Sequence, residues 1–318
     1  MRREFLALSA GTALAAPRDR VRRLVALTGD VSPDLAAVER RVSGRLGVAA
    51  LDTATGRRLE HRARERFPMC STFKWLLATE VLSRVDHGVE TLDRVVPYGQ
   101  ADLLDYAPIT RQHVSRGGMR VSDLLAAAIE VSDNTAANLL LASAGGPAAL
   151  TAFIRRLGDP TTRLDRNEPS LNTSIPGDPR DTTTPAAMVA DLQRVLLGRM
   201  LSDTSREHLV DWLVRCTTGG DKLRAGLPAG WRVGDKTGSG QHGSTNDVAI
   251  AWPQAGAPIL VVAYLTQTDA PPAERSAALA SVGEIVGRWV SAQRHWPALR
   301  RSDAKAKRQA RPGRVLQR

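Results

Sequence analysis

Apolar residues recur with helical spacing through most of the middle of the chain. Between Ser71 and Val85 they fall three or four positions apart, which is the spacing of one buried helix face. The same spacing predicts helices over residues 34–43, 121–131, 135–142, 146–157, 185–197 and 205–214. Glycine and proline separate these segments, so we expect individual helices joined by turns.

Short β-rich runs stand near both ends of the chain instead. Leu46–Leu51 and Arg57–His61 flank the turn-forming residues 52–56, which predicts a hairpin. Three further runs follow toward the C-terminus, at 231–235, 247–252 and 259–265. A last amphipathic helix is expected over 271–290. Strands at both ends with helices between them predict an α+β fold, in which an antiparallel five-stranded sheet is flanked by helices and stands beside an all-α lobe.

The 318 residues carry a formal net charge of +11, which raises the question of a nucleic-acid or membrane partner. The charge lies at the ends: residues 1–23 have six basic and two acidic side chains, and residues 291–318 have nine and one. Residues 24–290 are left at net −1, and aromatic residues make up only 4% of the chain. We therefore expect no nucleic-acid partner for the body, and keep a basic-tailed binding module as the alternative.

The two ends differ in their expected roles. Arg2 and Arg3 precede an apolar run that ends in small residues, which predicts an export signal at 1–16 of the twin-arginine kind and a periplasmic or secreted protein. A frayed amphipathic helix is the alternative, and the run is too short for stable membrane insertion. Residues 17–32 form a linker. The basic tail at 291–318 has few apolar residues, so we expect disorder there.

Two cysteines, Cys70 and Cys216, stand far apart in the sequence. In an exported protein they could pair, but Cys70 lies in an apolar run, which favours a buried free thiol. No Cys/His group has the spacing of metal ligands, so neither a metal nor another cofactor is expected.

Three short motifs carry chemistry. On a helix, Ser71 and Lys74 of Ser-Thr-Phe-Lys share one face, so the lysine amine can act on the serine hydroxyl as a base. Ser132-Asp133-Asn134 forms a polar turn at a helix start, where an ordinary N-cap is the alternative. Lys236-Thr237-Gly238 follows the strand 231–235 and offers a cation and a hydroxyl to a carboxylate.

In this order and at these separations, the three motifs resemble those of class A serine β-lactamases. The likeness runs over residues 33–290 and is strongest to exported, extended-spectrum-like members with a cysteine before the nucleophile. It implies a catalytic domain at 33–290, with an α/β part at 33–65 and 215–290, an all-α part at 66–214, and the active site between them. It also implies a monomer that acts on a small-molecule β-lactam.

A fourth element separates hydrolases from penicillin-binding proteins, which share the three motifs. The run Arg166-Asn-Glu168-Pro-Ser-Leu-Asn172 is similar to the omega loop of class A enzymes. The resemblance assigns Glu168 and Asn172 to the water that hydrolyses the acyl-enzyme, and Arg166 and Asp181 to the ion pair that closes the loop. A D,D-peptidase acting on cell-wall peptides remains the alternative, although it gives no reason for Glu168.

The resemblance implies a role for each residue of the acylation step. Ser71 is the nucleophile, Ser132 relays a proton to the leaving nitrogen, and the backbone N–H groups of Ser71 and Ser239 form the oxyanion hole. Either Lys74 or Glu168 is the base, a question that is disputed for the family.

Other residues are implied in substrate binding. Lys236 and Thr237 bind the substrate carboxylate, and Thr245 stands where many members have arginine. The missing cation then comes from Lys222, which we favour, or from Arg275.

Three residues bear on the rest of the substrate. Asn134 is implied to bind its acylamino group, and Tyr106 to line the cleft entrance. Gly240 stands where class A carbapenemases have a disulfide cysteine, which argues against a carbapenemase.

Overall fold

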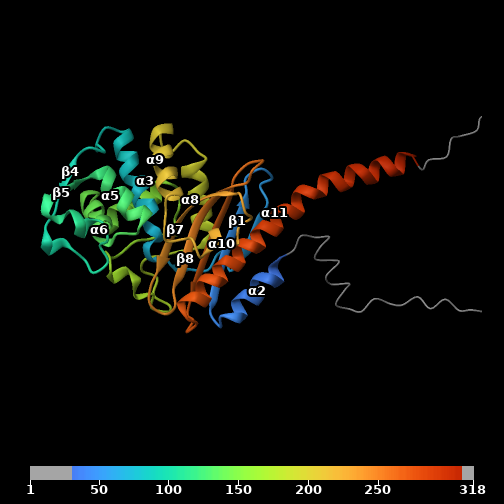
Figure 1. Cartoon of the computed structure of the whole chain (residues 1–318), viewed down its shortest axis with the longest axis horizontal. Helices are drawn as coiled ribbons and strands as arrows, with labels where there is room; N and C mark the ends of the chain where they lie inside the picture. Colours follow the sequence, from blue (N-terminus) through green and yellow to red (C-terminus); the bar gives the residue numbers. More distant parts are fainter. Residues whose placement is uncertain (1–30, 310–318) are drawn as a thin grey trace, which may run out of the picture. The chain divides into compact units, whose positions relative to one another are not determined.

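A five-stranded antiparallel sheet joins strands from both ends of the chain (Figure 1). Its strands are β1 (Arg45–Asp52), β2 (Arg58–His61), β7 (Arg232–Ser239), β8 (Thr245–Trp252) and β9 (Ile259–Thr266). The order across the sheet is β2-β1-β9-β8-β7, and each neighbouring pair is antiparallel. The predicted sheet is thus confirmed.

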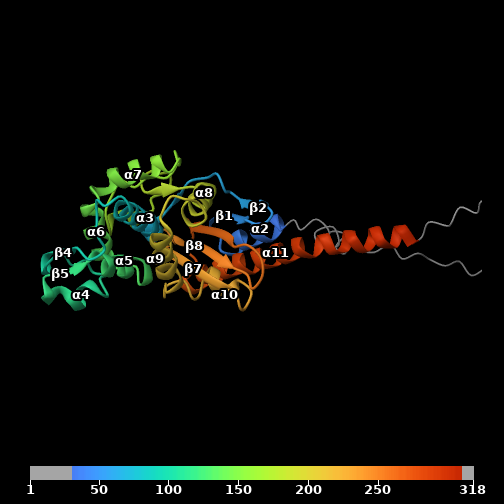
Figure 2. The same cartoon turned by 90° about the horizontal axis from the view of Figure 1, so that it is seen from above.

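Helices cover both faces of this sheet. All eight residues of β9 are buried, which explains its continuous apolar sequence. Helix α2 (Ser32–Arg41) and the first part of α11 (Pro272–Gln309) lie on one face (Figure 2). On the other face, α8 (Pro185–Leu196) packs against β1 and β9. We had placed α8 in the all-α part, but its apolar side faces the sheet.

The remaining helices form the all-α lobe around α3. They are α3 (Phe73–Asp86), α4 (Thr110–His113), α5 (Val121–Glu130), α6 (Asn134–Ser143), α7 (Gly146–Arg156) and α9 (Asp203–Val214); the short helix α10 (Leu223–Gly226) lies apart from them and packs against α11 at Ala280 and Gly283. Helix α3 is buried over its first eleven residues, because α5, α6, α7 and α9 all pack against it. One hydrophobic cluster runs from these helices into the sheet, so the two parts share a core.

Short elements connect these layers. The 3₁₀ turns are η1 (Cys70–Thr72), η2 (Gln100–Asp102), η3 (Val114–Arg116) and η4 (Ser170–Thr173). The two-stranded ribbons are β3 (Phe67–Pro68) with β6 (Thr182–Thr183), and β4 (Val95–Pro97) with β5 (Gly118–Arg120). The first ribbon is important for the site, since β6 ends the segment that carries Glu168 and β3 precedes Ser71.

The computed structural model describes residues 31–309, with side chains as far as Ala292. Residues Ser32–Val290 form one compact unit. The predicted export signal, nearly all of the linker, and residues 310–318 lie outside the described part. The backbone of α11 is helical to Gln309, so the helix end expected at Val290 is wrong. Residues 298–309 are rich in Ala, Arg and Lys, which are strong helix formers.

Within residues 31–309, no single helix has both the length and the apolar character needed to cross a membrane. Helices α6 and α7, bent by 74° relative to each other, pass that test only when they are taken together.

Candidate active site

Ser71 and Lys74 lie where η1 meets α3. Cys70, just before the serine, has a φ of 45°, so the chain turns sharply and presents Ser71 at the start of the helix. Strand β7 packs against η1 at Gly238. A Cβ on this glycine would lie 2.8 Å from the Met69 carbonyl oxygen and 3.1 Å from the Ser71 nitrogen. Only glycine therefore allows β7 to approach the serine this closely.

The Lys74 amine is fully buried and lies at the centre of the site. Its Nζ donates to the Ser132 carbonyl oxygen at 2.8 Å and to Asn134 Oδ1 at 2.6 Å. Ser132, between α5 and α6, has a φ of 62°, which turns its carbonyl toward the lysine. Asp133 also caps α6 by accepting from the Ala136 N–H. The predicted N-cap and the predicted site motif are therefore the same turn.

Glu168 brings a third segment to the same point, residues 161–183, which we call the omega segment. Its Oε1 accepts a hydrogen bond from Ser71 Oγ at 2.7 Å and lies 3.1 Å from Lys74 Nζ. Its Oε2 accepts from Asn172 Nδ2. The side chain is buried, so a carboxylate, a hydroxyl and an amine share one dry site.

Burial and charge set the protonation of this pair. Burial lowers the pKa of Lys74 below its ordinary value, and the Glu168 carboxylate offsets only part of that effect. Burial by itself would raise the pKa of Glu168. The charge of Lys74 and the hydrogen bonds from Ser71, Lys74 and Asn172 outweigh burial, so the pKa lies below its ordinary value. Glu168 is therefore ionised at neutral pH, beside a lysine that releases its proton more readily than a solvated one.

Asn138 on α6 is a site residue that the sequence analysis missed. Its Nδ2 donates to the Glu168 carbonyl oxygen at 2.8 Å, and its Oδ1 accepts from the Glu168 N–H at 3.0 Å. It follows Asn134 by four positions and so lies on the same face of α6. That spacing was the only signal for it in the sequence.

The third wall of the site is β7. Lys236 is buried, and its Nζ donates to Ser132 Oγ at 3.0 Å and to the Thr237 carbonyl oxygen at 2.8 Å. Burial lowers the pKa of Lys236 to about 8. We expected Lys236-Thr237-Gly238 to follow the strand, but β7 continues to Ser239, because each of these residues pairs with β8.

An open cavity of about 320 Å³, which we call the catalytic cleft, exposes these groups to substrate. Its lining residues are Ser71, Tyr106, Ser132, Asn134, Asn172, Thr218, Lys222, Thr237, Gly238 and Ser239. Lys74, Glu168 and Lys236 are buried behind this wall. Tyr106 is half exposed at the rim, where its hydroxyl donates to the Val131 carbonyl oxygen at 3.1 Å.

Of the two candidate cations, Lys222 lines the cleft and Arg275 does not. Lys222 Nζ donates to the Thr218 carbonyl oxygen at 3.2 Å and pairs with Asp221 at 2.6 Å. Thr218, also missed from the sequence, shares a 2.5 Å hydrogen bond between its hydroxyl and that of Thr237.

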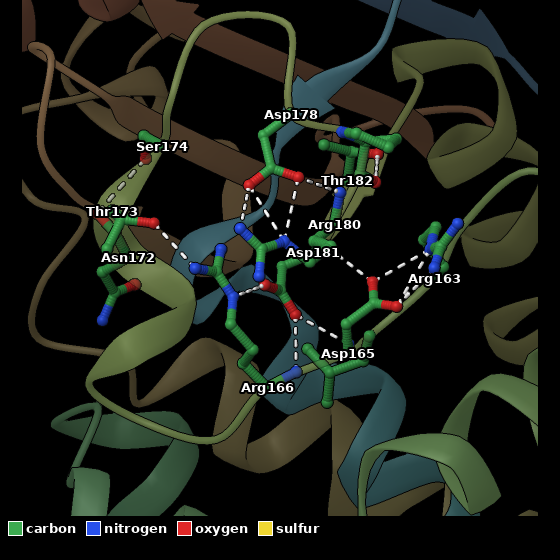
Figure 3. A network of polar contacts seen from close by, with 12 residues as sticks. Arg163, Asp165, Arg166, Asn172, Thr173, Ser174, Asp178, Arg180, Asp181 and Thr182 are labelled. Carbon is green, nitrogen blue, oxygen red and sulfur yellow. Dashed lines mark hydrogen bonds and ion pairs between the residues drawn. The ribbon is translucent and has the colours of Figure 1, made fainter.

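Ion pairs fix the omega segment behind Glu168 (Figure 3). Arg166 Nε lies 2.6 Å from Asp181 Oδ2, the pair implied by the resemblance, and Asp181 is buried. The other oxygen of Asp181 accepts from the backbone N–H groups of Asp165 and Arg166, at 2.7 and 2.9 Å. Arg166 also donates to Thr173 Oγ1 at 2.9 Å. One carboxylate thus ties the start of the segment to its end.

Both cysteines are free and buried. Burial raises the pKa of Cys70 to about 12 and that of Cys216 to about 11, so neither is a ready thiolate. A Cβ on Gly240 would lie 2.7 Å from Cys70 Sγ, which shows how close the two positions are. In the described part of the chain, no group of three or more His, Cys, Asp or Glu side chains could hold a metal ion.

The site places a serine hydroxyl in contact with a buried glutamate and close to a buried lysine, and comparison with known proteins identifies the family. A model of the β-lactamase enzyme family matches residues 30–290. β-Lactamase L2 of Stenotrophomonas maltophilia is 52% identical over 288 residues, which is 90% of this chain and 92% of that protein. β-Lactamase CTX-M-8 of Citrobacter amalonaticus is 49% identical, covering 83% and 90%.

A solved structure of an ancestral class A β-lactamase aligns with a TM-score of 0.80 and 61% identity, over 81% of this chain and 98% of that one. The chain therefore belongs to the β-lactamase enzyme family, as a class A serine enzyme, and the resemblance drawn from its motifs is confirmed.

Proposed function

We propose that this protein hydrolyses β-lactam antibiotics, penicillins and cephalosporins, through an acyl-enzyme on Ser71, and so confers resistance to them. The observation that carries the proposal is the buried, ionised Glu168, in hydrogen-bond contact with both Ser71 Oγ and Asn172. A carboxylate at that point can activate water against an ester on Ser71.

In the acylation step, Ser71 Oγ attacks the lactam carbonyl carbon, and the C–N bond of the ring breaks. The hydroxyl proton leaves toward the pair formed by Glu168 and Lys74, both of which lie at the serine. Ser132 delivers a proton to the departing nitrogen, since its hydroxyl accepts from both Lys74 and Lys236.

Binding groups surround the reacting carbonyl. The backbone N–H groups of Ser71 and Ser239 form the oxyanion hole, where each such donor is worth about 3–4 kcal/mol in the transition state. Lys236, Thr237 and Lys222 bind the substrate carboxylate. Asn134 binds the acylamino side chain, and Tyr106 lines the entrance.

In the deacylation step, a water held by Glu168 and Asn172 attacks the ester carbon. Glu168 takes one proton from the water, the bond from carbon to Ser71 Oγ breaks, and the proton returns to Oγ. This step distinguishes the proposal from a D,D-peptidase, which offers no role for a carboxylate fixed in this way.

The test is turnover of a chromogenic cephalosporin by the purified protein and by its Glu168→Ala variant. We expect sustained turnover by the first, and in the second a long-lived adduct on Ser71 that mass spectrometry of the intact protein detects. Glu60→Ala, an exposed glutamate outside the cleft, is the control and should keep full activity. Full steady-state hydrolysis by Glu168→Ala would contradict the assigned role, and single-turnover acylation of the unmodified protein would favour the peptidase.

We also infer that the enzyme is exported to the periplasm and acts as a monomer. The first inference rests on the paired arginines and apolar run of residues 1–16. Replacing Arg2 and Arg3 by lysine should keep the protein in the cytoplasm, as activity measured in cell fractions would reveal. Sedimentation at micromolar concentration tests the second inference.

A further inference from the structure

A second cavity, of about 630 Å³, lies between β2 and α8, and it shares no lining residue with the catalytic cleft. Its walls come from β2 and the residues that follow it, from the loop at 158–161 after α7, and from Thr184 and helix α8. The floor on α8 is made of Ala186, Ala187 and Ala190, whose small side chains leave the space open.

Arginine dominates the rim of this cavity. Arg58, Arg64, Arg66 and Arg194 all line it. Among the described residues, the first three pair with no carboxylate, whereas Arg194 pairs with Asp191 at 3.0 Å. Arg66 is held in place, since its Nη1 donates to the Thr161 carbonyl oxygen at 2.9 Å and to Thr182 Oγ1 at 3.0 Å.

Two acidic side chains, Glu60 and Asp159, also line the cavity. Only Glu60 is free to offset the positive charge of the arginines. Glu60 is exposed and unpaired among the described residues. Asp159 is buried, its Oδ1 accepts from the N–H groups of Thr161 and Thr162, and its carboxyl group lies close to that of Asp191. Burial and the negative charge of the neighbouring Asp159 raise the pKa of Asp191 to about 8, so Asp191 is largely protonated at neutral pH.

Arg194 pairs with Asp191 and therefore faces these two acids. The guanidinium groups of Arg58, Arg64 and Arg66 then have only the Glu60 carboxylate to offset their charge. The cavity is thus locally positive, although residues 24–290 carry a net charge of −1. Guanidinium forks bind phosphate oxygens in pairs, and an anion with two or more charges matches three of them better than a carboxylate does. We propose that this cavity binds a molecule carrying a phosphate or diphosphate group, through Arg58, Arg64 and Arg66.

The cavity also contacts both ends of the segment that carries Glu168, at Thr161 and Thr184. An anion bound there would join the chain after β2 to these ends, and so should stabilise the folded protein in proportion to its occupancy. This anion-binding cavity does not include the catalytic cleft. Substitutions that abolish anion binding there need not affect hydrolysis.

The test is calorimetric titration of the full-length protein with pyrophosphate, beside the double variant Arg58→Ala/Arg64→Ala. We expect saturable one-to-one binding by the unmodified protein, a rise in its melting temperature, and at least tenfold weaker binding by the variant. Arg40→Ala/Arg199→Ala removes the same charge from exposed arginines outside the cavity and should bind as the unmodified protein does. Turnover of the chromogenic cephalosporin checks that each variant is folded.

Vesicles distinguish the two sources of the phosphate group. Binding to phosphatidylglycerol vesicles, lost in the Arg58/Arg64 variant and absent with phosphatidylcholine, would identify a lipid headgroup. Binding of pyrophosphate alone would identify a soluble ligand. The proposal is overturned if neither probe binds, or if the Arg58/Arg64 and Arg40/Arg199 variants bind equally well.

Discussion

Lys236 is buried, yet its proposed role, binding the substrate carboxylate, requires a positive charge. Its pKa of about 8 lies well below that of a solvated lysine, mainly because burial disfavours the cation. The cation is present below pH 8 and is lost as the pH rises through that value. We therefore expect kcat/KM for a β-lactam to fall on the alkaline side with a limb near pH 8.

The check is the pH profile of kcat/KM for the unmodified enzyme and for Lys236→Arg. This ratio reports the ionisation of the free enzyme. Arginine stays charged across the range, so the limb should move above about pH 9 in the variant, even if its absolute activity is lower. An identical alkaline limb in both proteins would assign it to another group.

Lys222 and Arg275 offer a matched pair of substitutions. Only Lys222 lines the catalytic cleft, next to Thr218 and Thr237. Since a hydrogen bond to a charged group contributes about 1.5–3 kcal/mol, Lys222→Ala should lower kcat/KM for a penicillin at least tenfold, mainly through KM. Arg275→Ala should leave both constants unchanged, and steady-state kinetics on the two variants decide between the cations.

The sequence predicted those site residues whose signal is local, and it missed those whose role depends on packing. Ser71 and Lys74 are three positions apart on one element, so their contact follows from helix geometry. Asn138 acts on Glu168 across thirty residues of chain. Thr218 meets Thr237 only because the loop before α10 folds against β7. Neither contact has a sequence spacing of its own: the position of Asn138 four residues after Asn134 indicates a shared helix face but not its partner, and Thr218 has no such signal.

Among the elements, the omega segment depends most on a few charged groups. Asp181 is buried and accepts three hydrogen bonds, one from Arg166 Nε and two from backbone N–H groups, so its loss leaves these three donors without their acceptor. Breaking a buried pair typically costs about 3–5 kcal/mol. Asp181→Ala should therefore loosen this segment and slow deacylation.

Hydrogen exchange over residues 161–183, together with the lifetime of the acyl-enzyme, measures this effect. Asp178→Ala is the control, because Asp178 pairs with the half-exposed Arg180 at the surface of the same segment. Surface pairs contribute about 0–1 kcal/mol, so exchange and turnover should change little in the control. Equal effects of the two substitutions would show that the buried pair has no special role.

Element boundaries show the limits of local patterns. The end of β7 was misplaced because Lys236 and Gly238 have weak strand preference, and pairing with β8 extends the strand through them. The end of α11 was misplaced for the opposite reason. Residues 291–309 contain too few apolar residues to signal a packed helix, yet their composition favours helical backbone.

For the whole molecule, strands from both ends of the chain determine where the site forms. The β1–β9 pairing joins residues about two hundred positions apart, and it completes the sheet whose edge strand β7 faces η1. The catalytic groups thus come from α3, the α5–α6 turn, the omega segment and β7. The excess positive charge of the chain lies elsewhere in the sequence. Nine basic residues fall at 291–318, outside the compact unit Ser32–Val290 that holds all of these catalytic groups.

Removal of residues 294–318 tests whether the basic tail and the enzyme are independent. All site residues lie within Ser32–Val290, so we expect kcat/KM and the melting temperature to stay as they are. The cut removes nine basic residues and one acidic residue, so retention on a cation-exchange column should fall sharply. A variant with the tail intact and its nine basic residues replaced by glutamine separates the effect of charge from that of length. A loss of activity or of stability in the truncated protein would mean that the tail supports the catalytic unit.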